Sequence, residues 1–291
     1  MSSAFVFPGQ GSQSVGMGKD LAEKYLGLAG RILGFDLKTI VLDGPEEALK
    51  RTEIQQPAIF TVSVAAFESL KARNLLPDLV AGHSLGEYSA LYAAGAISFE
   101  DGVKTVNRRG KYMQEAVPPG AGAMAALLGG ERETIANICK EVGNVWPANF
   151  NSPGQVVISG TREAVEAAGT KLKAAGVKKI IPLAVSAPFH CPLMQPAADK
   201  LAAQLDQISF RDAGIPVYAN VTGKPAAAGA ELKRLLIEQV TGSVLWEDSV
   251  RNMVADGARS FTEVGPGKVL AGLIKKIDPG VEVKSYDEAK G

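Results

Sequence analysis

The sequence predicts an α/β fold in which helices cover a parallel sheet and a smaller antiparallel unit interrupts the chain. Strand-like and helix-like segments alternate in residues 1–121 and again in 188–291, as is typical of a parallel sheet. Residues 122–187 instead follow the order β-α-β-β-α-β, which is the ferredoxin-like arrangement. We therefore expect a large domain in two parts, 1–121 and 188–291, with a ferredoxin-like small subdomain at 122–187.

The first part of the large domain begins with a short apolar strand. Apolar runs predict strands at 5–7 and 79–81, as expected for buried parallel strands. Apolar residues at helical spacing predict the helices of this part. These helices are expected at about 17–33, 57–73, 85–94 and 100–115.

The remaining elements follow from the same periodicities. In the small subdomain, strands are expected at 123–128, 145–150, 155–159 and 179–185, with helices at 132–142 and 161–175. A turn at 151–154 joins its two middle strands. In the last part, helices are expected at 192–205, 230–240, 246–256 and from the turn 265–267 to 277, and strands at 216–220, 260–264 and 281–285.

Composition excludes several classes of protein. Hydrophobic residues make up 46% of the chain and charged residues 21%, as in ordinary globular proteins. The 31 basic residues balance the 31 acidic ones, so neither nucleic acid nor a membrane surface is an expected partner. No signal peptide or membrane-spanning run is visible. Cys139 and Cys191 match no disulfide or zinc spacing, so we expect a cytoplasmic enzyme without a metal. No feature of the sequence requires more than one copy of the chain, so we expect a monomer.

The most informative motif is Gly-x-Ser-x-Gly, formed by Gly82, Ser84 and Gly86. A strand precedes it and a helical pattern follows, which is the context of a nucleophile on a sharp turn. The glycines allow a strained backbone, and the helix N-terminus beneath the serine suits an oxyanion. The motif alone can occur by chance, but in this context it predicts Ser84 as a nucleophile.

A serine nucleophile needs a base, and the chain has only two histidines. His83 directly precedes Ser84, so its side chain should diverge and pack against the turn or bond to backbone. His190 lies where the small subdomain ends and could reach across the cleft, although a histidine with a purely structural role is the alternative. The sequence singles out no carboxylate to orient the imidazole, and a backbone carbonyl could serve equally well.

A second glycine-rich turn, residues 8–13, follows the first strand. It satisfies neither the dinucleotide-binding motif nor the Walker motif. A loop at this end of a strand is well placed to supply one N–H of an oxyanion hole, with Leu85 supplying the other.

Arg108 and Arg109 lie on the helix that follows the nucleophile helix. Composition alone makes both of them solvated surface residues. An arginine that faced the pocket would instead bind a substrate carboxylate bidentately, and periodicity does not decide between these alternatives.

At this point the chain resembles the malonyl-CoA:acyl carrier protein transacylases, the acyltransferases of bacterial fatty acid synthesis. The resemblance covers nearly the whole chain and depends on several blocks in the same order. The blocks are FVFPGQGSQ at 5–13, QQPA at 55–58, GHSLGEYSA at 82–90, RGKYMQ at 109–114, NSPGQ at 151–155 and EVGPGKVL at 263–270.

The resemblance implies an α/β-hydrolase-like large domain and a ping-pong reaction without a cofactor, in which a coenzyme A thioester is a substrate. Ser84 would take malonyl from malonyl-CoA and pass it to the phosphopantetheine thiol of acyl carrier protein, a transient partner. His190, in the pattern Ser-x-x-x-His-x-x-x-Met that begins at Ser186, matches the family's base.

The resemblance also implies roles for four other residues. Leu85 and Gln10 match the backbone donors of the oxyanion hole, Arg109 matches the arginine that binds the malonyl carboxylate, and Gln239 lies where a backbone carbonyl orients the histidine. Cys191 would have a packing role. A thioesterase or lipase with the same Ser–His pair, and a non-catalytic carrier-binding module, are the rival interpretations. The segment 187–189 does not settle malonyl against methylmalonyl.

Overall fold

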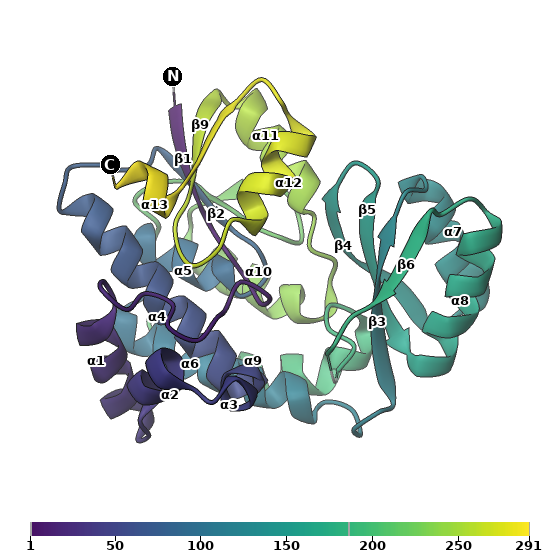
Figure 1. Cartoon of the computed structure of the whole chain (residues 1–291), viewed down its shortest axis with the longest axis horizontal. Coiled ribbons are helices and arrows are strands. Elements are labelled where there is room, and N and C mark those ends of the chain that lie inside the picture. Colours follow the sequence, from purple (N-terminus) through teal and green to yellow (C-terminus); the bar gives the residue numbers. More distant parts are fainter. Residues whose placement is uncertain (1, 186, 291) are drawn as a thin grey trace.

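The computed structural model describes residues 2–185 and 187–290, and its two sheets form two parts of the molecule (Figure 1). The strands are β1 (Ser2–Phe7), β2 (Leu79–Gly82), β3 (Gly122–Leu128), β4 (Val145–Ser152), β5 (Gln155–Thr161), β6 (Lys179–Pro182), β7 (Val217–Tyr218), β8 (Pro225–Ala226), β9 (Ala258–Glu263) and β10 (Glu282–Ser285). Ser186 of the predicted histidine pattern lies outside the described residues.

The helices pack around both sheets. They are α1 (Glu23–Leu33), α2 (Leu37–Asp43), α3 (Glu46–Lys50), α4 (Thr52–Lys71), α5 (Gly86–Ala93), α6 (Phe99–Glu115), α7 (Arg132–Val142), α8 (Arg162–Ala174), α9 (Gln195–Leu205), α10 (Gly229–Thr241), α11 (Trp246–Ala255), α12 (Val269–Ile277) and α13 (Tyr286–Ala289), with a 3₁₀ turn η1 (Pro192–Met194).

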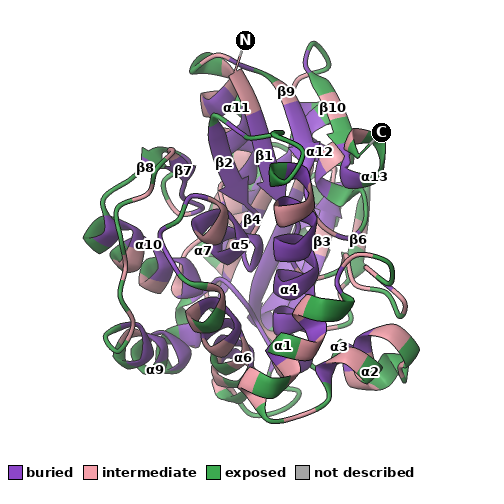
Figure 2. Ribbon diagram, turned by 90° about the vertical axis from the view of Figure 1, so that its left-hand side faces the viewer, coloured by how far each residue is buried: buried purple, intermediate pink, exposed green. Residues whose placement is uncertain are grey.

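The larger sheet has the order β10-β9-β1-β2-β7-β8, and all its pairs are parallel except the edge pair β7–β8. Successive residues of β1 face opposite sides, as the pleat requires. Phe5 and Phe7 belong to the core under α4, α5 and α6, whereas Ala4 and Val6 belong to the core under α11 and α12. Helices therefore cover both faces, and the central strands are buried (Figure 2).

The smaller sheet is antiparallel throughout and has the order β4-β5-β3-β6, which is the ferredoxin-like order. Helices α7 and α8 cover its outer face (Figure 1). Met124, Ala148 and Val157 face the other way and join the core of the large domain. The predicted α/β fold with a parallel core and a ferredoxin-like insertion is confirmed.

Some predicted boundaries were wrong at the N-terminal end. Helix α1 begins at Glu23, not near residue 17, because Gly16 and Gly18 have φ values of +85° and +69°. Glycines with left-handed φ values interrupt a helix, so the apolar residues between 17 and 22 lie in turns. The short helices α2 and α3, and later the two-residue strand β8 and the terminal α13, were not predicted.

Helix α4 begins at Thr52, five residues before the proline that the sequence suggested as its start. Pro57 has no N–H to donate to the carbonyl of Glu53, one turn earlier. Asn107 Nδ2 of α6 donates to that oxygen instead, at 2.7 Å. A side chain from another helix thus allows the proline inside α4.

Two strands are shorter than predicted. Strand β6 ends at Pro182, not at residue 185, although Leu183 N–H still donates to the Met124 oxygen of β3 at 2.9 Å. Strand β7 contains only Val217 and Tyr218, so Asn220 lies beyond its carboxyl end. This position brings the Asn220 side chain to the edge of the sheet where Ser84 lies, as described below.

Candidate active site

Ser84 lies in the tight turn between β2 and α5, with a left-handed φ of +51°. The turn requires its two glycines because the backbone approaches closely. A Cβ on Gly82 would lie 1.9 Å from the Gly86 carbonyl carbon, and a Cβ on Gly86 would lie 2.0 Å from the Phe7 oxygen. The sequence thus folds into a strained elbow that holds the Ser84 hydroxyl at the N-terminus of α5.

His190 makes a direct hydrogen bond to Ser84. Its Nε2 lies 2.7 Å from Ser84 Oγ, and its Nδ1 lies 2.9 Å from the backbone oxygen of Gln239. Since a carbonyl can only accept, Nδ1 carries the proton and Nε2 is left as the acceptor for the serine hydroxyl. The group on Nδ1, which the sequence left open, is therefore a backbone carbonyl.

The surroundings of His190 favour the neutral imidazole. The side chain is 4% exposed, and burial together with the nearby Arg109 cation lowers its pKa to about 3. A neutral ring has a free lone pair on Nε2, which is the form that can take a proton from Ser84.

Arg109 is fully buried, whereas its neighbour Arg108 is exposed. Its Nη2 donates to Ser84 Oγ at 3.2 Å and to Gln239 Oε1 at 2.9 Å, and Nη1 donates to Gln56 Oε1 at 2.9 Å. All three acceptors are neutral, and Arg109 makes no ion pair with any carboxylate of the described chain. A buried cation whose partners are uncharged suits an anionic ligand.

Gln10 lies on the loop after β1, and this loop packs against the elbow. A Cβ on Gly9 would lie 2.4 Å from the His83 oxygen, so the two turns are in close contact. The backbone N–H groups of Gln10 and Leu85 donate to no acceptor among the residues that the structure describes. The Gln10 side chain is bonded to Gln55 at 2.6 Å.

His83 turns away from Ser84 and packs against the turns here, as predicted, since a Cβ on Gly9 would lie 3.6 Å from His83 Nδ1. Its Nε2 lies 2.8 Å from the Asn151 side-chain oxygen, and its ring packs beside Trp246. The bond to Asn151 was not predicted, because Asn151, in the small subdomain, approaches the elbow only in the folded chain. His83, Asn151 and Gln155 line a cavity of about 130 Å³ together with Gln10 and Leu270.

Two further residues contact the elbow and were not predicted to have a role. Asn220 Oδ1 accepts the N–H of Ser84 at 2.6 Å, and Glu87 Oε2 accepts from Gln239 Nε2 at 2.8 Å. Glu87 directly follows the Gly-x-Ser-x-Gly motif, and Asn220 is a polar residue at the end of a predicted strand. Those two signals could have drawn attention to them.

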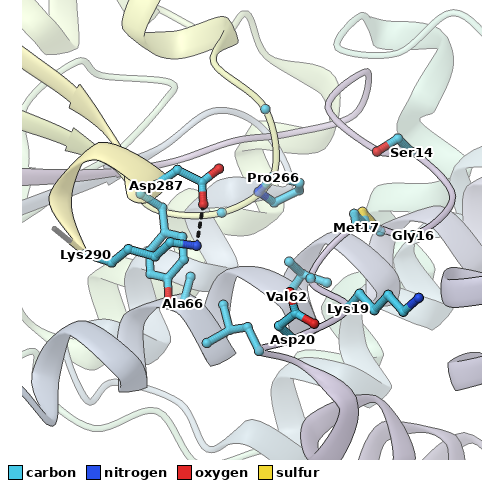
Figure 3. A pocket seen from close by; sticks show the side chains of 15 residues that line it. Ser14, Gly16, Met17, Lys19, Asp20, Val62, Ala66, Pro266, Asp287 and Lys290 are labelled. Carbon is cyan, nitrogen blue, oxygen red and sulfur yellow. Dashed lines mark ion pairs between the residues drawn. The ribbon is translucent and has the colours of Figure 1, made fainter.

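A separate cavity of about 310 Å³ lies between the loop after β1 and the C-terminal helix α13 (Figure 3). Lys19, Asp20, Pro266 and the ion-paired Asp287 and Lys290 line it. Neither Ser84 nor His190 lines this cavity.

Within the part of the chain that the structure describes, no group of His, Cys, Asp or Glu could hold a metal ion, and no helix is long and apolar enough to cross a membrane. Cys191 is buried and donates to the Pro188 oxygen, which agrees with packing.

Comparison with known proteins places this geometry in a family. The acyl transferase domain model matches residues 4–286. The chain is 50% identical over 295 residues to the malonyl CoA-acyl carrier protein transacylase of Escherichia coli (strain K12), with 98% of this chain and 96% of that protein covered.

Solved structures agree. An acyl carrier protein S-malonyltransferase from Vibrio cholerae O1 biovar eltor is 45% identical, with a TM-score of 0.96 over 98% of this chain and 96% of that one. A malonyl-transacylase in complex with a type II PKS acyl-carrier protein is also 45% identical, with a TM-score of 0.94 over 98% and 95% of the two chains. The chain belongs to the malonyl CoA-acyl carrier protein transacylases within the acyl transferase domain family.

Proposed function

We propose that this protein transfers malonyl from malonyl-CoA to the phosphopantetheine thiol of acyl carrier protein through an ester on Ser84. One observation carries the proposal: Ser84 Oγ is bonded both to the His190 imidazole at 2.7 Å and to the buried Arg109 guanidinium at 3.2 Å. The first contact supports a nucleophile, and the second supports an acyl group that carries a carboxylate.

In the first half-reaction, His190 Nε2 removes the Ser84 proton while Oγ attacks the thioester carbonyl. The N–H groups of Leu85 and Gln10 stabilise the negative oxygen of the tetrahedral intermediate. The intermediate collapses as the carbon–sulfur bond breaks, and His190 returns the proton to the coenzyme A thiolate. Malonyl is left as an ester on Ser84.

In the second half-reaction, His190 takes the proton of the carrier thiol, whose sulfur attacks the ester carbonyl. Ser84 Oγ then leaves and recovers the proton from His190. The Gln239 carbonyl keeps Nδ1 protonated in both halves, so Nε2 alternates between base and acid. These steps use only groups of the chain and the two thiols.

Arg109 binds the free carboxylate of malonyl through its planar fork, which gives both charge and geometry. A lipase has no use for a buried cation beside its serine. The arginine also holds malonyl in one orientation, with its reacting carbonyl over Ser84. The malonyl group is then passed to the thiol of the carrier protein.

Substitution of Arg109 tests the proposal. Arg109→Ala should lower malonyl transfer about a hundredfold or more, since a buried charge pair is lost, and should change acetyl transfer far less. The neighbouring Arg108→Ala is the matched control, because Arg108 is exposed. Transfer and hydrolysis are measured separately with malonyl-CoA and acetyl-CoA, with and without carrier protein. Equal losses for both acyl groups, or free malonate as the main product of the parent, would contradict the proposal.

The proposal extends to the organisation of the chain and its context. Segments 1–121 and 188–291 form the large domain and 122–187 the small subdomain; the change from parallel to antiparallel pairing supports these boundaries. The protein acts as a monomer in the cytoplasm. Its two cysteines are free thiols, as is usual in a reducing compartment.

A further inference from the structure

The backbone of Ser84 is held on both sides by side chains. Its N–H donates to Asn220 Oδ1 at 2.6 Å, and its carbonyl accepts from Gln239 Nε2 at 3.0 Å. Asn220 Nδ2 also donates to the Gly82 oxygen at 2.6 Å, so this one amide spans the elbow. A serine with positive φ persists only where its surroundings fix it, and these amides do so.

Gln239 also contacts the other two groups of the site. Its backbone oxygen accepts from His190 Nδ1, and its side-chain Oε1 accepts from Arg109 Nη2 at 2.9 Å. The second contact requires the amide to be placed with Oε1 toward the guanidinium. If the amide rotated by half a turn, an NH₂ group would face the cation and Ser84 would lose a donor.

The backbone N–H of Asn220 and the side-chain amide of Gln239 meet at one carboxylate oxygen. Glu87 Oε2 accepts from the Asn220 backbone N–H at 3.0 Å and from Gln239 Nε2 at 2.8 Å. Glu87 is 1% exposed, and Asn220 and Gln239 are equally buried. An oxygen at this point accepts only, so it fixes which end of the Gln239 amide faces Arg109.

We infer that Glu87 is a positioning residue of the acyl-transfer site, which acts with Asn220 to hold the Ser84 elbow and the orientation of Gln239. The inference rests on the proposed function but adds residues that touch neither substrate nor the reacting atoms. Nucleophile, base and carboxylate-binding group are all linked to this one oxygen through Asn220 or Gln239.

The acceptor oxygen, rather than the charge, is the property that matters. Burial raises the pKa of Glu87 to about 7, against the opposing effects of its N–H donors and of the Arg109 cation. A carboxyl group protonated on its other oxygen would still accept both hydrogen bonds at Oε2. Glutamine at this position offers the same single acceptor, so Glu87→Gln should restore what Glu87→Ala loses.

The test follows the reactivity of Ser84 by two methods. Labelling by a fluorophosphonate reports the nucleophile without malonyl binding, and the burst with malonyl-CoA reports acylation. Because small displacements of reacting groups slow reactions steeply, Glu87→Ala should lower both rates about tenfold to a hundredfold. Rates are expressed per folded molecule, with the fraction folded taken from circular dichroism. Glu87→Gln should stay within about threefold of the parent.

Glu263 provides the matched control, because it is a buried carboxylate that accepts two backbone N–H groups, those of Leu270 and Ala271. Glu263→Ala should lower stability and leave the labelling rate per folded molecule unchanged.

Glu87→Ala should also reduce the preference for malonyl over acetyl, because Gln239 no longer orients Arg109. A structural role alone would not move that ratio.

The inference is overturned if Glu87→Ala labels within twofold of the parent per folded molecule, or if Glu87→Gln is as slow as Glu87→Ala. Should Glu87→Ala fail to fold, Asn220→Ala decides: it removes the acceptor of the Ser84 N–H and must slow labelling about tenfold. A parent that resists the fluorophosphonate, or a Ser84→Ala variant that still transfers malonyl, would instead overturn the proposed function.

Discussion

His190 is kept neutral by the residues around it, and this has consequences for pH. Burial is the main cause of its lowered pKa, and the Arg109 cation adds to it. A histidine that was free in water would be half protonated near pH 6.5. The residue proposed as base is therefore ready to accept a proton well below neutral pH.

The first prediction concerns the pH profile of acylation. The acid limb of kcat/KM for malonyl-CoA should lie about one pH unit or more below 6.5, because kcat/KM reports the free enzyme. The stability of the folded protein should also depend on pH through the protonation of His190. Between about pH 3 and 6.5 the unfolded chain binds a proton on His190 that the folded chain does not, so stability falls as pH falls through this window. A limb at 6.5 or above would contradict this account.

A second prediction separates the two causes. Arg109→Ala removes the cation that lowers the pKa of His190, so the acid limb should move upward toward 6.5. Fluorophosphonate labelling across pH is the suitable measurement, because it does not need malonyl to bind. Arg108→Ala should leave the limb in place, since Arg108 contacts neither His190 nor Ser84. An unchanged limb in Arg109→Ala would assign the whole shift to burial.

Among single residues, the sequence predicted those whose role depends on neighbouring residues in the chain. The elbow of Ser84 could be read from a strand, two glycines and a helix. Local pattern could not distinguish Arg108 from Arg109, because the packing of α6 against α4 decides which of the two is buried. Asn220 is even harder to predict, since it lies 136 positions after Ser84 and meets it only in the folded chain.

At the scale of elements, α4 and α6 are adapted to each other. A Cβ on Gly110 would lie 2.5 Å from the Thr52 oxygen, so the helices approach closely beside Arg109. Asn107 of the same helix donates to the Glu53 carbonyl that Pro57 leaves without a partner one turn later. The contact between the two helices thus supplies what the α4 sequence lacks.

A double-mutant cycle tests this compensation. Asn107→Ala should cost about 1–3 kcal/mol of stability, because a carbonyl loses its donor inside the protein. In a Pro57→Ala background the helix has its own N–H for Glu53, so the same change should cost less than about 1 kcal/mol. Urea denaturation of the four proteins gives the coupling. Equal costs in both backgrounds would show that Asn107 does not serve the proline.

Helix boundaries were the least predictable part of the fold for the same reason. Proline favours a helix start, so the sequence placed the start of α4 at Pro57, and only a side chain from α6 explains the earlier one. The order of elements was predictable, because strand and helix periodicities depend on local sequence. Boundaries depend on distant partners.

At the scale of the whole molecule, the insertion of the small subdomain determines where His190 lies. The chain enters the subdomain at Gly122 and leaves it near Pro188, and a Cβ on Gly122 would lie 2.2 Å from Pro188 Cδ. Entry and exit therefore touch, and His190 follows two residues later. Any movement of the subdomain would be transmitted to the base.

Polar contacts add to the apolar packing that holds the subdomain against the large domain. Asn149 of β4 pairs in parallel with Val244, and His83 is bonded to Asn151. At the outer end, Arg132 of α7 makes a two-fold ion pair with Asp248 of α11, with N–O distances of 2.7 and 2.9 Å. The guanidinium also lies 4.1 Å from the centre of the Phe150 ring.

The last prediction concerns this outer contact. Arg132 and Asp248 are each about a third exposed, at 39% and 34%, so water screens the pair and the interaction should be modest. A double-mutant cycle with Arg132→Ala and Asp248→Ala should give a coupling of about 0.5–1 kcal/mol, which 1 M salt should reduce. Labelling of Ser84 should be unchanged in both variants, because the inner contacts remain. A slower reaction at Ser84 would mean that the outer ion pair, rather than the bonds near the elbow, keeps His190 in place.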